Sequence, residues 1–146
     1  MECFQVQVSH VILEREVHHN LSNSTDTTLT NWATVEKYQG GITYASGVFT
    51  VPSTGVYLIF YTISWDDNTT GTRNSNYYIN NSGSSRRARI NFGGAANAGQ
   101  GMNVNASDIC ALTASDTLRV VVWQNCGASL GCIVDDACRI GVVRIF

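Results

Sequence analysis

The stretch Gly55-Val-Tyr-Leu-Ile-Phe-Tyr-Thr-Ile-Ser-Trp65 decides the fold of this chain. Its pattern repeats every two residues, which is the period of a β-strand and not of a helix. Both faces of the strand are apolar, with Val56, Leu58 and Phe60 on one and Tyr57, Ile59, Tyr61, Ile63 and Trp65 on the other. An antiparallel sandwich usually leaves one face of a sheet polar and wet. Both faces of this strand are therefore expected to be covered.

The segments on either side continue as short strands between turns rich in Gly, Asn and Ser. No stretch of ten or more residues has helical apolar spacing, which argues against an α-helical domain. Residues 1–146 are therefore predicted to form one all-β domain, a sandwich of two antiparallel sheets. Further strands are predicted at 4–8, 32–38, 42–51, 77–79, 86–92, 102–112, 118–124 and 139–146.

The composition narrows the class of protein. The 146 residues are 44% hydrophobic and only 14% charged, so that Asn, Ser and Thr must supply much of the polar surface. A net charge of −2 gives no general attraction to nucleic acid. No apolar run approaches the roughly 18 residues of a membrane span, so no membrane insertion is expected. No signal peptide is visible, and the neutral polar surface favours an extracellular or virion-associated protein.

Two other predicted strands, 118–124 and 139–146, are also apolar on both faces. A large exposed apolar surface is an association site, so we expect other copies of the chain to cover one face. The alternative is that loops or the N-terminal segment of the same chain cover it. Aromatic rings with polar ends suit a packed contact between subunits. The predicted subunit interface consists of Tyr57, Tyr61, Trp123, Val143 and Ile145.

The residues that lead into the first strand resemble a known family. The run Phe49-Thr-Val-Pro-Ser-Thr-Gly55-Val-Tyr57-Leu-Ile59-Phe-Tyr61 is similar to the central motif of the complement C1q globular-head family. That motif has Phe, five residues, and then Gly-x-Tyr-x-Phe-x-Phe/Tyr, so Ile59 is the single departure. Residues 112–124 and 141–146 resemble later segments of the family, with Ser115 where Gly is usual. The resemblance extends from about residue 4 to residue 146.

This resemblance implies a ten-stranded jelly roll, shared with the tumour necrosis factor (TNF) superfamily, and a tight homotrimer. The implied function is a non-enzymatic recognition head that binds a cell-surface receptor or a glycan. It would sit at the tip of a viral or phage fibre, or act as a secreted lectin-like protein. The alternative is a purely structural trimerisation or virion module without a ligand. The chain lacks the G-x-S-x-G, H-E-x-x-H and P-loop motifs, so no catalytic residues are predicted.

The segment Arg86-Arg87-Ala88-Arg89 is the only basic cluster. Strand alternation would place Arg87 and Arg89 on one face, where they could grip a carboxylate, a sialic acid or a sulfate. The alternative is a charged edge strand that discourages pairing between sheets. The predicted ligand-binding residues are Arg86, Arg87, Arg89, Tyr77 and Asn68.

The cysteines leave two interpretations open. Cys126 and Cys138 flank the turn between the last two predicted strands, where they could form a disulfide across the hairpin or remain free buried thiols. The spacing of the five cysteines does not fit a metal site, and no cofactor is predicted. Calcium is the one alternative considered, with Asp66-Asp67 and Asp135-Asp136 as oxygen ligands.

Overall fold

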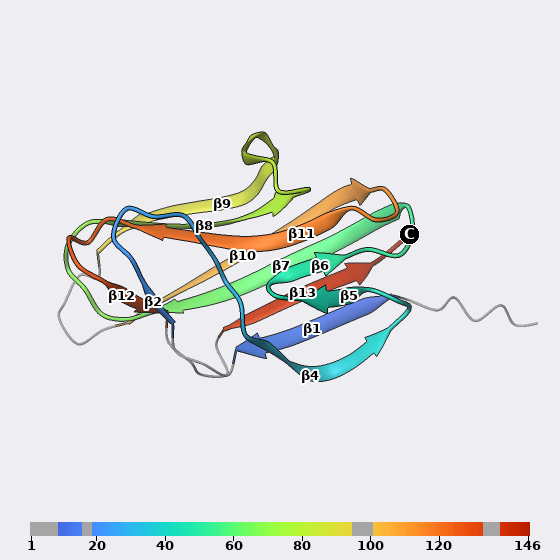
Figure 1. Cartoon of the computed structure of the whole chain (residues 1–146), viewed down its shortest axis with the longest axis horizontal. Coiled ribbons are helices and arrows are strands. Elements are labelled where there is room, and N and C mark those ends of the chain that lie inside the picture. The colour runs from blue at the N-terminus through green and yellow to red at the C-terminus, as the bar shows by residue number, and fades with distance from the viewer. Residues whose placement is uncertain (1–8, 16–18, 95–100, 133–137) are drawn as a thin grey trace, which may run out of the picture.

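The computed structural model describes residues 9–15, 19–94, 101–132 and 138–146, which form two antiparallel β-sheets packed face to face (Figure 1). We call them sheet A and sheet B. Sheet A contains β1 (His10–Arg15), β2 (His19–Leu21), β4 (Trp32–Gln39), β7 (Gly55–Trp65), β10 (Met102–Leu112), β12 (Leu130–Cys132) and β13 (Arg139–Arg144). Sheet B contains β3 (Thr27–Thr28), β5 (Thr43–Ala45), β6 (Val48–Thr50), β8 (Thr72–Ile79), β9 (Arg86–Gly93) and β11 (Thr117–Gln124).

Strand β7 lies inside sheet A, and strands β8 and β11 lie inside sheet B. In sheet A, β7 pairs with β10 along one edge and with β13 along the other, so that Leu58 lies between Ile109 and Val143. In sheet B, β8 lies between β11 and β9. This arrangement is a jelly-roll sandwich, as the sequence predicted. The described residues contain thirteen strands rather than ten, because short strands such as β2, β3 and β12 pair at the sheet edges.

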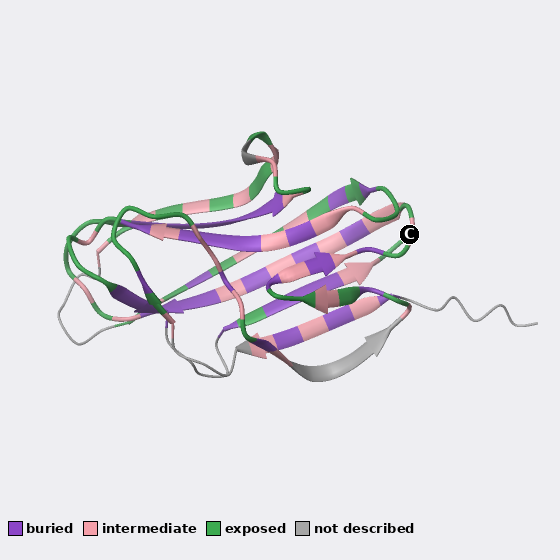
Figure 2. Cartoon of the chain, in the orientation of Figure 1, coloured by how far each residue is buried: buried purple, intermediate pink, exposed green. Residues whose placement is uncertain are grey.

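The core lies between the two sheets, as the alternation of colours along β7 and β11 in Figure 2 shows. The inward face of β7 is fully buried, and it packs in one core with the inward residues of the sheet B strands. Large, fully buried residues of this layer include Phe49, Tyr57, Ile59, Tyr61, Ile63, Trp65, Tyr77 and Leu118.

The burial of Tyr57 and Tyr61 corrects the prediction that they form a subunit interface. They are 0% and 1% exposed within a single chain and have no surface left for a neighbour. Their polar ends are also satisfied inside the chain. The hydroxyl of Tyr57 donates to the carbonyl of Ser53 at 2.7 Å, and that of Tyr61 donates to the carbonyl of Ala88 at 2.6 Å. The larger, more aromatic face of β7 therefore fills the core.

The predicted strand positions hold for most of the chain. β7 and β10 have the predicted bounds, whereas β8 begins five residues before the predicted strand 77–79. The predicted strand 4–8 lies outside the described residues. Among the described residues, no helix has the length and apolar character that spanning a membrane requires.

Candidate recognition surfaces

The outer face of sheet A carries an apolar patch. The outward residues of β7 are half-buried, and those of β10, β13 and β1 adjoin them across the strand pairs. Ile109 on β10 is 59% exposed, and Ile145, just after β13, is 37% exposed. We call this surface the apolar face, formed by Ile12, Val56, Leu58, Phe60, Ile109, Val143 and Ile145.

The remaining predicted interface residues are divided between two surfaces. Val143 and Ile145 lie on the apolar face, and their contact with a neighbouring subunit stays a prediction. Trp123 instead lies on the outer side of sheet B, because Val122 and Gln124 of the same strand point into the core. Trp123 is therefore not part of the apolar face.

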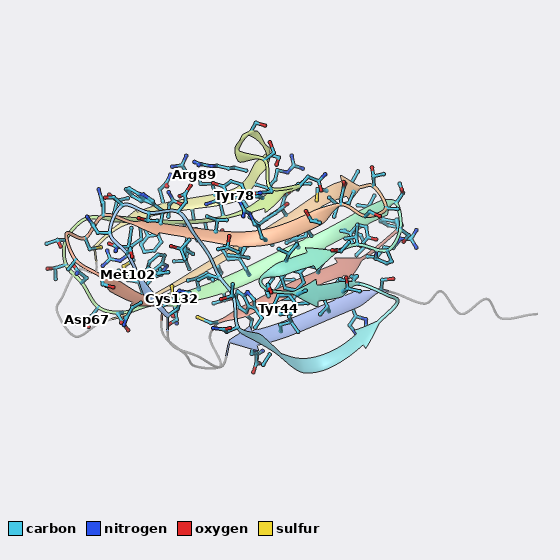
Figure 3. The ribbon with its side chains drawn as sticks, viewed as in Figure 1. Tyr44, Asp67, Tyr78, Arg89, Met102 and Cys132 are labelled. Carbon is cyan, nitrogen blue, oxygen red and sulfur yellow. The ribbon has the colours of Figure 1, made fainter. Side chains whose placement is uncertain are left out.

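A groove crosses the outer face of sheet B. It has a volume of about 420 Å³, within the usual range for small-molecule sites. Strands β8, β9 and β11 and the loop between β2 and β3 supply its walls. Figure 3 shows Tyr78 and Arg89 on this side of the molecule, away from Cys132 and Tyr44. The residues lining this sheet B groove are Ser24, Asp26, Asn74, Arg86, Arg89 and Trp123.

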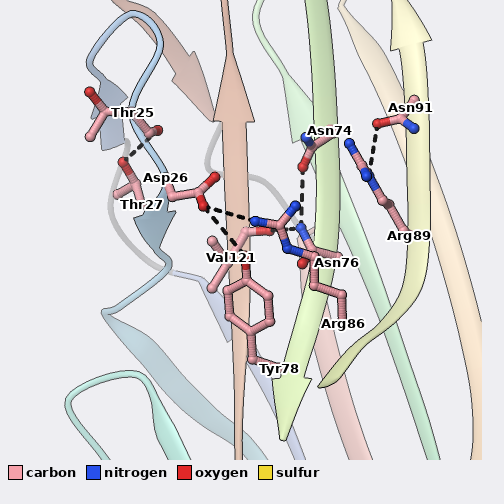
Figure 4. A network of polar contacts seen from close by, with 10 residues as sticks. All are labelled: Thr25, Asp26, Thr27, Asn74, Asn76, Tyr78, Arg86, Arg89, Asn91 and Val121. Atoms are coloured by element: carbon pink, nitrogen blue, oxygen red, sulfur yellow. Dashed lines mark hydrogen bonds and ion pairs between the residues drawn. The ribbon is translucent and has the colours of Figure 1, made fainter. Parts of the chain in front are cut away.

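A polar network fixes the side chains at one end of the groove (Figure 4). Oδ2 of Asp26 accepts hydrogen bonds from the hydroxyl of Tyr78 and from Arg86, each at 3.4 Å. The guanidinium groups of Arg86 and Arg119 lie 5.4 Å and 5.3 Å from the centre of the Tyr78 ring, in the range of cation–π contacts. Asp26, Tyr78 and Arg86 therefore hold one another in place.

Arg89 lies at the same groove but has weaker partners. Its Nε donates to Oδ1 of Asn91 at 3.2 Å. No carboxylate among the described residues pairs with it, whereas Arg86, Arg87 and Arg139 each have one. Arg89 thus brings a largely uncompensated positive charge to the groove.

A β-bulge changes the predicted arrangement of the basic cluster. The register of β8 against β9 shifts between Ser75 and Tyr77, and Ala88 has a left-handed φ of 45°. The bulge breaks the simple alternation of side chains in β9. Arg86 and Arg89 consequently share the groove, and the prediction that Arg87 and Arg89 act on one face is wrong.

Arg87 instead joins a cluster at the edge between the sheets. Its Nε lies 3.1 Å from Oδ2 of Asp108, which also accepts a hydrogen bond of 2.8 Å from the hydroxyl of Tyr77. The same hydroxyl lies 3.7 Å from Sγ of Cys110. Burial and the adjacent Asp108 raise the pKa of Tyr77, and burial raises the pKa of the Cys110 thiol.

Tyr77 is therefore a core residue and not a ligand-binding one, since it is 1% exposed. The sequence prediction chose the wrong tyrosine of an adjacent pair, because Tyr77 and Tyr78 lie on opposite sides of β8. Tyr78 is the one that faces the groove network, and the sequence prediction did not include it.

Asn68 lies in the loop between β7 and β8, at one end of the sandwich, and does not line the groove. Its Oδ1 accepts a hydrogen bond from the N–H of Thr70 at 2.8 Å, and its carbonyl accepts one from Arg73 at 2.7 Å. Arg73 is fully buried and also donates to the carbonyls of Thr70 and Gly93. Asn68 and Arg73 together shape this end loop.

Of the two interpretations left open for Cys126 and Cys138, the disulfide is not formed, because Cys126 carries a free thiol. Cys138 is buried, and its Sγ accepts a hydrogen bond from the N–H of Ser64 at 3.1 Å. Of the residues considered as alternative calcium ligands, Asp135 and Asp136 lie outside the described residues. Within the part that is described, no cluster of three or more His, Cys, Asp or Glu side chains could hold a metal ion.

Comparison with known proteins establishes the fold. No protein-family model matches the chain, and no curated sequence matches it. Solved structures do match. Murine APRIL at pH 5.0 has a TM-score of 0.74 at 18% identity, over 95% of this chain and 100% of that one. Eiger TNF from S. frugiperda has a TM-score of 0.74 at 18% identity, over 96% of this chain and 94% of that one.

The domain is therefore a C1q/TNF-like jelly roll.

Proposed function

We propose that this chain is a non-enzymatic, homotrimeric recognition head that binds a receptor or a glycan outside the cell. The observation that carries this proposal is the apolar face of sheet A. Exposed apolar surface of this kind marks an association site, and the fold is one that assembles through such surfaces in the family the sequence resembles.

The energy available from covering the apolar face is substantial. Burying one large apolar side chain that was exposed contributes about 1.5–3 kcal/mol. Ile109 offers most of its surface for such burial, and Leu58 and Phe60 offer part of theirs. Self-association also explains why this face of β7 is apolar although it lies outside the core.

The opposite end of the same face carries polar side chains, which form hydrogen bonds with one another within the chain. The hydroxyl of Thr62 donates to Oδ1 of Asn105 at 2.6 Å, and the hydroxyl of Ser64 donates to Oδ1 of Asn103. These cross-strand pairs need no partner from another chain. The apolar end would therefore supply most of the binding energy in a subunit contact, and the polar end would tolerate water.

The outer face of sheet B suits recognition instead. It lies on the other side of the sandwich and carries the sheet B groove, lined mainly by polar and charged side chains. A trimer that buries the apolar face leaves three such grooves exposed. Loops and grooves on a rigid scaffold are the usual location of binding residues.

A pair of charge substitutions tests the assembly. Ile109→Asp places a carboxylate within the proposed contact, and we expect the purified chain to become a single-copy species by size-exclusion chromatography with light scattering. Asn91→Asp is the matched control, since it adds the same charge at an exposed position of β9. Unchanged circular dichroism in both variants would show that the fold is retained. Equal oligomeric states for both variants would contradict the proposed interface.

Recognition is tested separately from assembly. The labelled wild-type protein is applied to a printed glycan array and to intact cells. Binding above that of a heat-unfolded sample is expected on at least one of the two surfaces. Absence of binding on both would leave a purely structural trimerisation module as the better account.

A further inference from the structure

We infer that the sheet B groove binds a carboxylated sugar, a pyranose that bears one carboxylate among several hydroxyl groups. This inference rests on the proposed recognition function and names its ligand class. It is argued from four features of the groove: its charge, its hydrogen-bonding groups, its aromatic wall and its rigidity.

The charge of the groove favours a single anionic group. Two guanidinium groups and one carboxylate line it, in a chain whose net charge is −2. Asp26 is engaged by Arg86, while Arg89 faces the groove with only the amide of Asn91 as partner. Arginine binds a carboxylate through two parallel N–H groups, which makes it well suited to this anion. Arg89 is thus the expected anchor for the ligand carboxylate.

The hydrogen-bonding groups suit sugar hydroxyls. Each hydroxyl both donates and accepts, so it is best met by a mixture of donors and acceptors. The groove offers the hydroxyl of Ser24, the carboxylate of Asp26 and the amide of Asn74. Oδ1 of Asn74 accepts a hydrogen bond of 3.2 Å from Asn76, and no described residue accepts from its Nδ2. That Nδ2 is therefore available as a donor to a ligand.

Trp123 supplies an apolar wall. It is half-buried at the edge of the groove, so part of the indole remains exposed beside the polar groups. One face of a pyranose ring is lined by C–H groups, which pack well against an aromatic surface. A simple inorganic anion would gain nothing from this residue.

The groove is held in shape before any ligand arrives. Tyr78 packs against Arg86 and Arg119, and the loop that carries Ser24 is fixed by a 2.7 Å hydrogen bond from its N–H to the carbonyl of Gln124. A preformed site loses little conformational entropy on binding, which matters for a small ligand with few contacts.

The same features argue against strongly anionic ligands. Asp26 lies in the groove and would repel a polymer with many charges, such as nucleic acid. An acidic peptide has the carboxylates but lacks the ring that Trp123 would pack against. A carboxylated sugar uses the arginine, the polar groups and the indole together.

Isothermal titration with defined probes tests this inference. The wild-type protein is titrated with 3′-sialyllactose, with a hyaluronan tetrasaccharide as the uronic acid, with neutral lactose and with a tetraglutamate peptide. We expect binding of one or both acidic sugars and about tenfold weaker binding, or none, for lactose. The two acidic sugars distinguish a sialic acid from a uronic acid. Equal binding of lactose, or tighter binding of the peptide, would overturn the inference.

Two neighbouring arginines give a matched pair of variants. Arg89→Gln removes the expected anchor, and we expect it to weaken binding of the acidic sugar about tenfold or more. Arg87→Gln removes the same charge two residues away but from the Asp108 cluster, so its affinity should stay within about twofold of wild type. Equal losses in both variants would show a general electrostatic effect and overturn the site.

The titration also separates this inference from the proposed trimer. Each groove lies within one chain, so the Ile109→Asp variant should bind the monovalent sugar as the wild type does. Sugar binding by a single-copy wild type would contradict the trimer and support the groove. A trimer that binds neither acidic sugar would overturn the groove alone.

Discussion

The ring of Phe60 on β7 lies over Gly141 on β13, so that a Cβ atom placed on Gly141 would overlap the ring. The two residues are direct partners in the strand pairing. Because Gly141 has no side chain, Phe60 lies against sheet A instead of standing out from it. This packing keeps the apolar face level, as the proposed contact with another copy requires.

The Gly141→Ala substitution tests this packing. The new methyl group must displace the Phe60 ring outward, and we expect about tenfold weaker self-association with little change in secondary structure. Sedimentation velocity over a dilution series measures the association. Gly93→Ala is the control, since a Cβ at Gly93 meets no atom within 4 Å. Unchanged association in Gly141→Ala would argue that the Phe60 side of sheet A is not buried in the assembly.

The Ser115→Gly substitution should stabilise the chain. Ser115 has a φ of 74°, in the left-handed region that costs a non-glycine residue about 1–2 kcal/mol. The gain is partly offset because glycine makes the unfolded chain more flexible, so we expect a net increase of about 0.5–1 kcal/mol in the free energy of unfolding. Urea denaturation measures it.

The reverse substitution at Gly47 is the control for Ser115→Gly, and it is expected to have the opposite effect on stability. Gly47 has a φ of 85°, and a Cβ there would lie 2.7 Å from the carbonyl oxygen of Leu29. Gly47→Ala should therefore lower the free energy of unfolding. A loss of stability in Ser115→Gly would show that the serine side chain contributes more than the backbone strain removes.

Alkaline pH should destabilise the fold through Tyr61. Burial raises the pKa of Tyr61 to about 12, whereas an unfolded tyrosine has a pKa near 10. The folded state therefore holds this proton more tightly. The contribution of protonated Tyr61 to the free energy of unfolding is complete below pH 10 and is lost as the pH rises towards 12.

Urea denaturation between pH 8 and pH 12 measures this effect. The decline in stability should be smaller in Tyr61→Phe, which has no proton to lose at that position. Tyr77 adds a decline of the same sign, since its pKa is also raised. Titration of Tyr61 near pH 10 in the folded protein, followed by its absorbance at 295 nm, would contradict the expectation.

Arg73 should stabilise the end of the sandwich without affecting assembly. Its fully buried guanidinium donates to the carbonyls of Asn68, Thr70 and Gly93. Arg73→Met keeps much of the apolar length and removes these bonds, and we expect a loss of about 2–3 kcal/mol in the free energy of unfolding. Faster amide hydrogen exchange confined to residues 66–72, at an unchanged oligomeric state, would be the signature. Rapid exchange spread across β7 would show a global role instead.

The sequence predicted the strands well because their two-residue period is a local property. Residues 55–65 and 102–112 are two of the predicted strands, and the structure has strands with those bounds. The same pattern does not tell which apolar face of β7 points inward. Which face points inward depends on the volume to be filled between the sheets. The face that carries Tyr57 has the larger side chains and fills this volume, whereas the face that carries Leu58 is smaller and points outward.

The candidate site was harder to predict, for two physical reasons. The bulge at Ala88 reverses the side of the strand on which Arg87 lies, and alanine gives no sequence signal for a positive φ. The groove also joins Ser24 and Trp123, which are far apart in sequence and meet because β3 pairs with β11. The basic cluster pointed to the correct strand, but only the tertiary structure shows which arginines act together.

The proposed assembly requires that other copies of this chain cover the apolar face of sheet A. Native mass spectrometry of the wild-type protein at micromolar concentration tests it most directly. We expect a dominant species with the mass of three 15.9 kDa chains, which persists on moderate dilution. A dominant species of one chain at every concentration, with Leu58 and Ile109 left open to solvent, would contradict it.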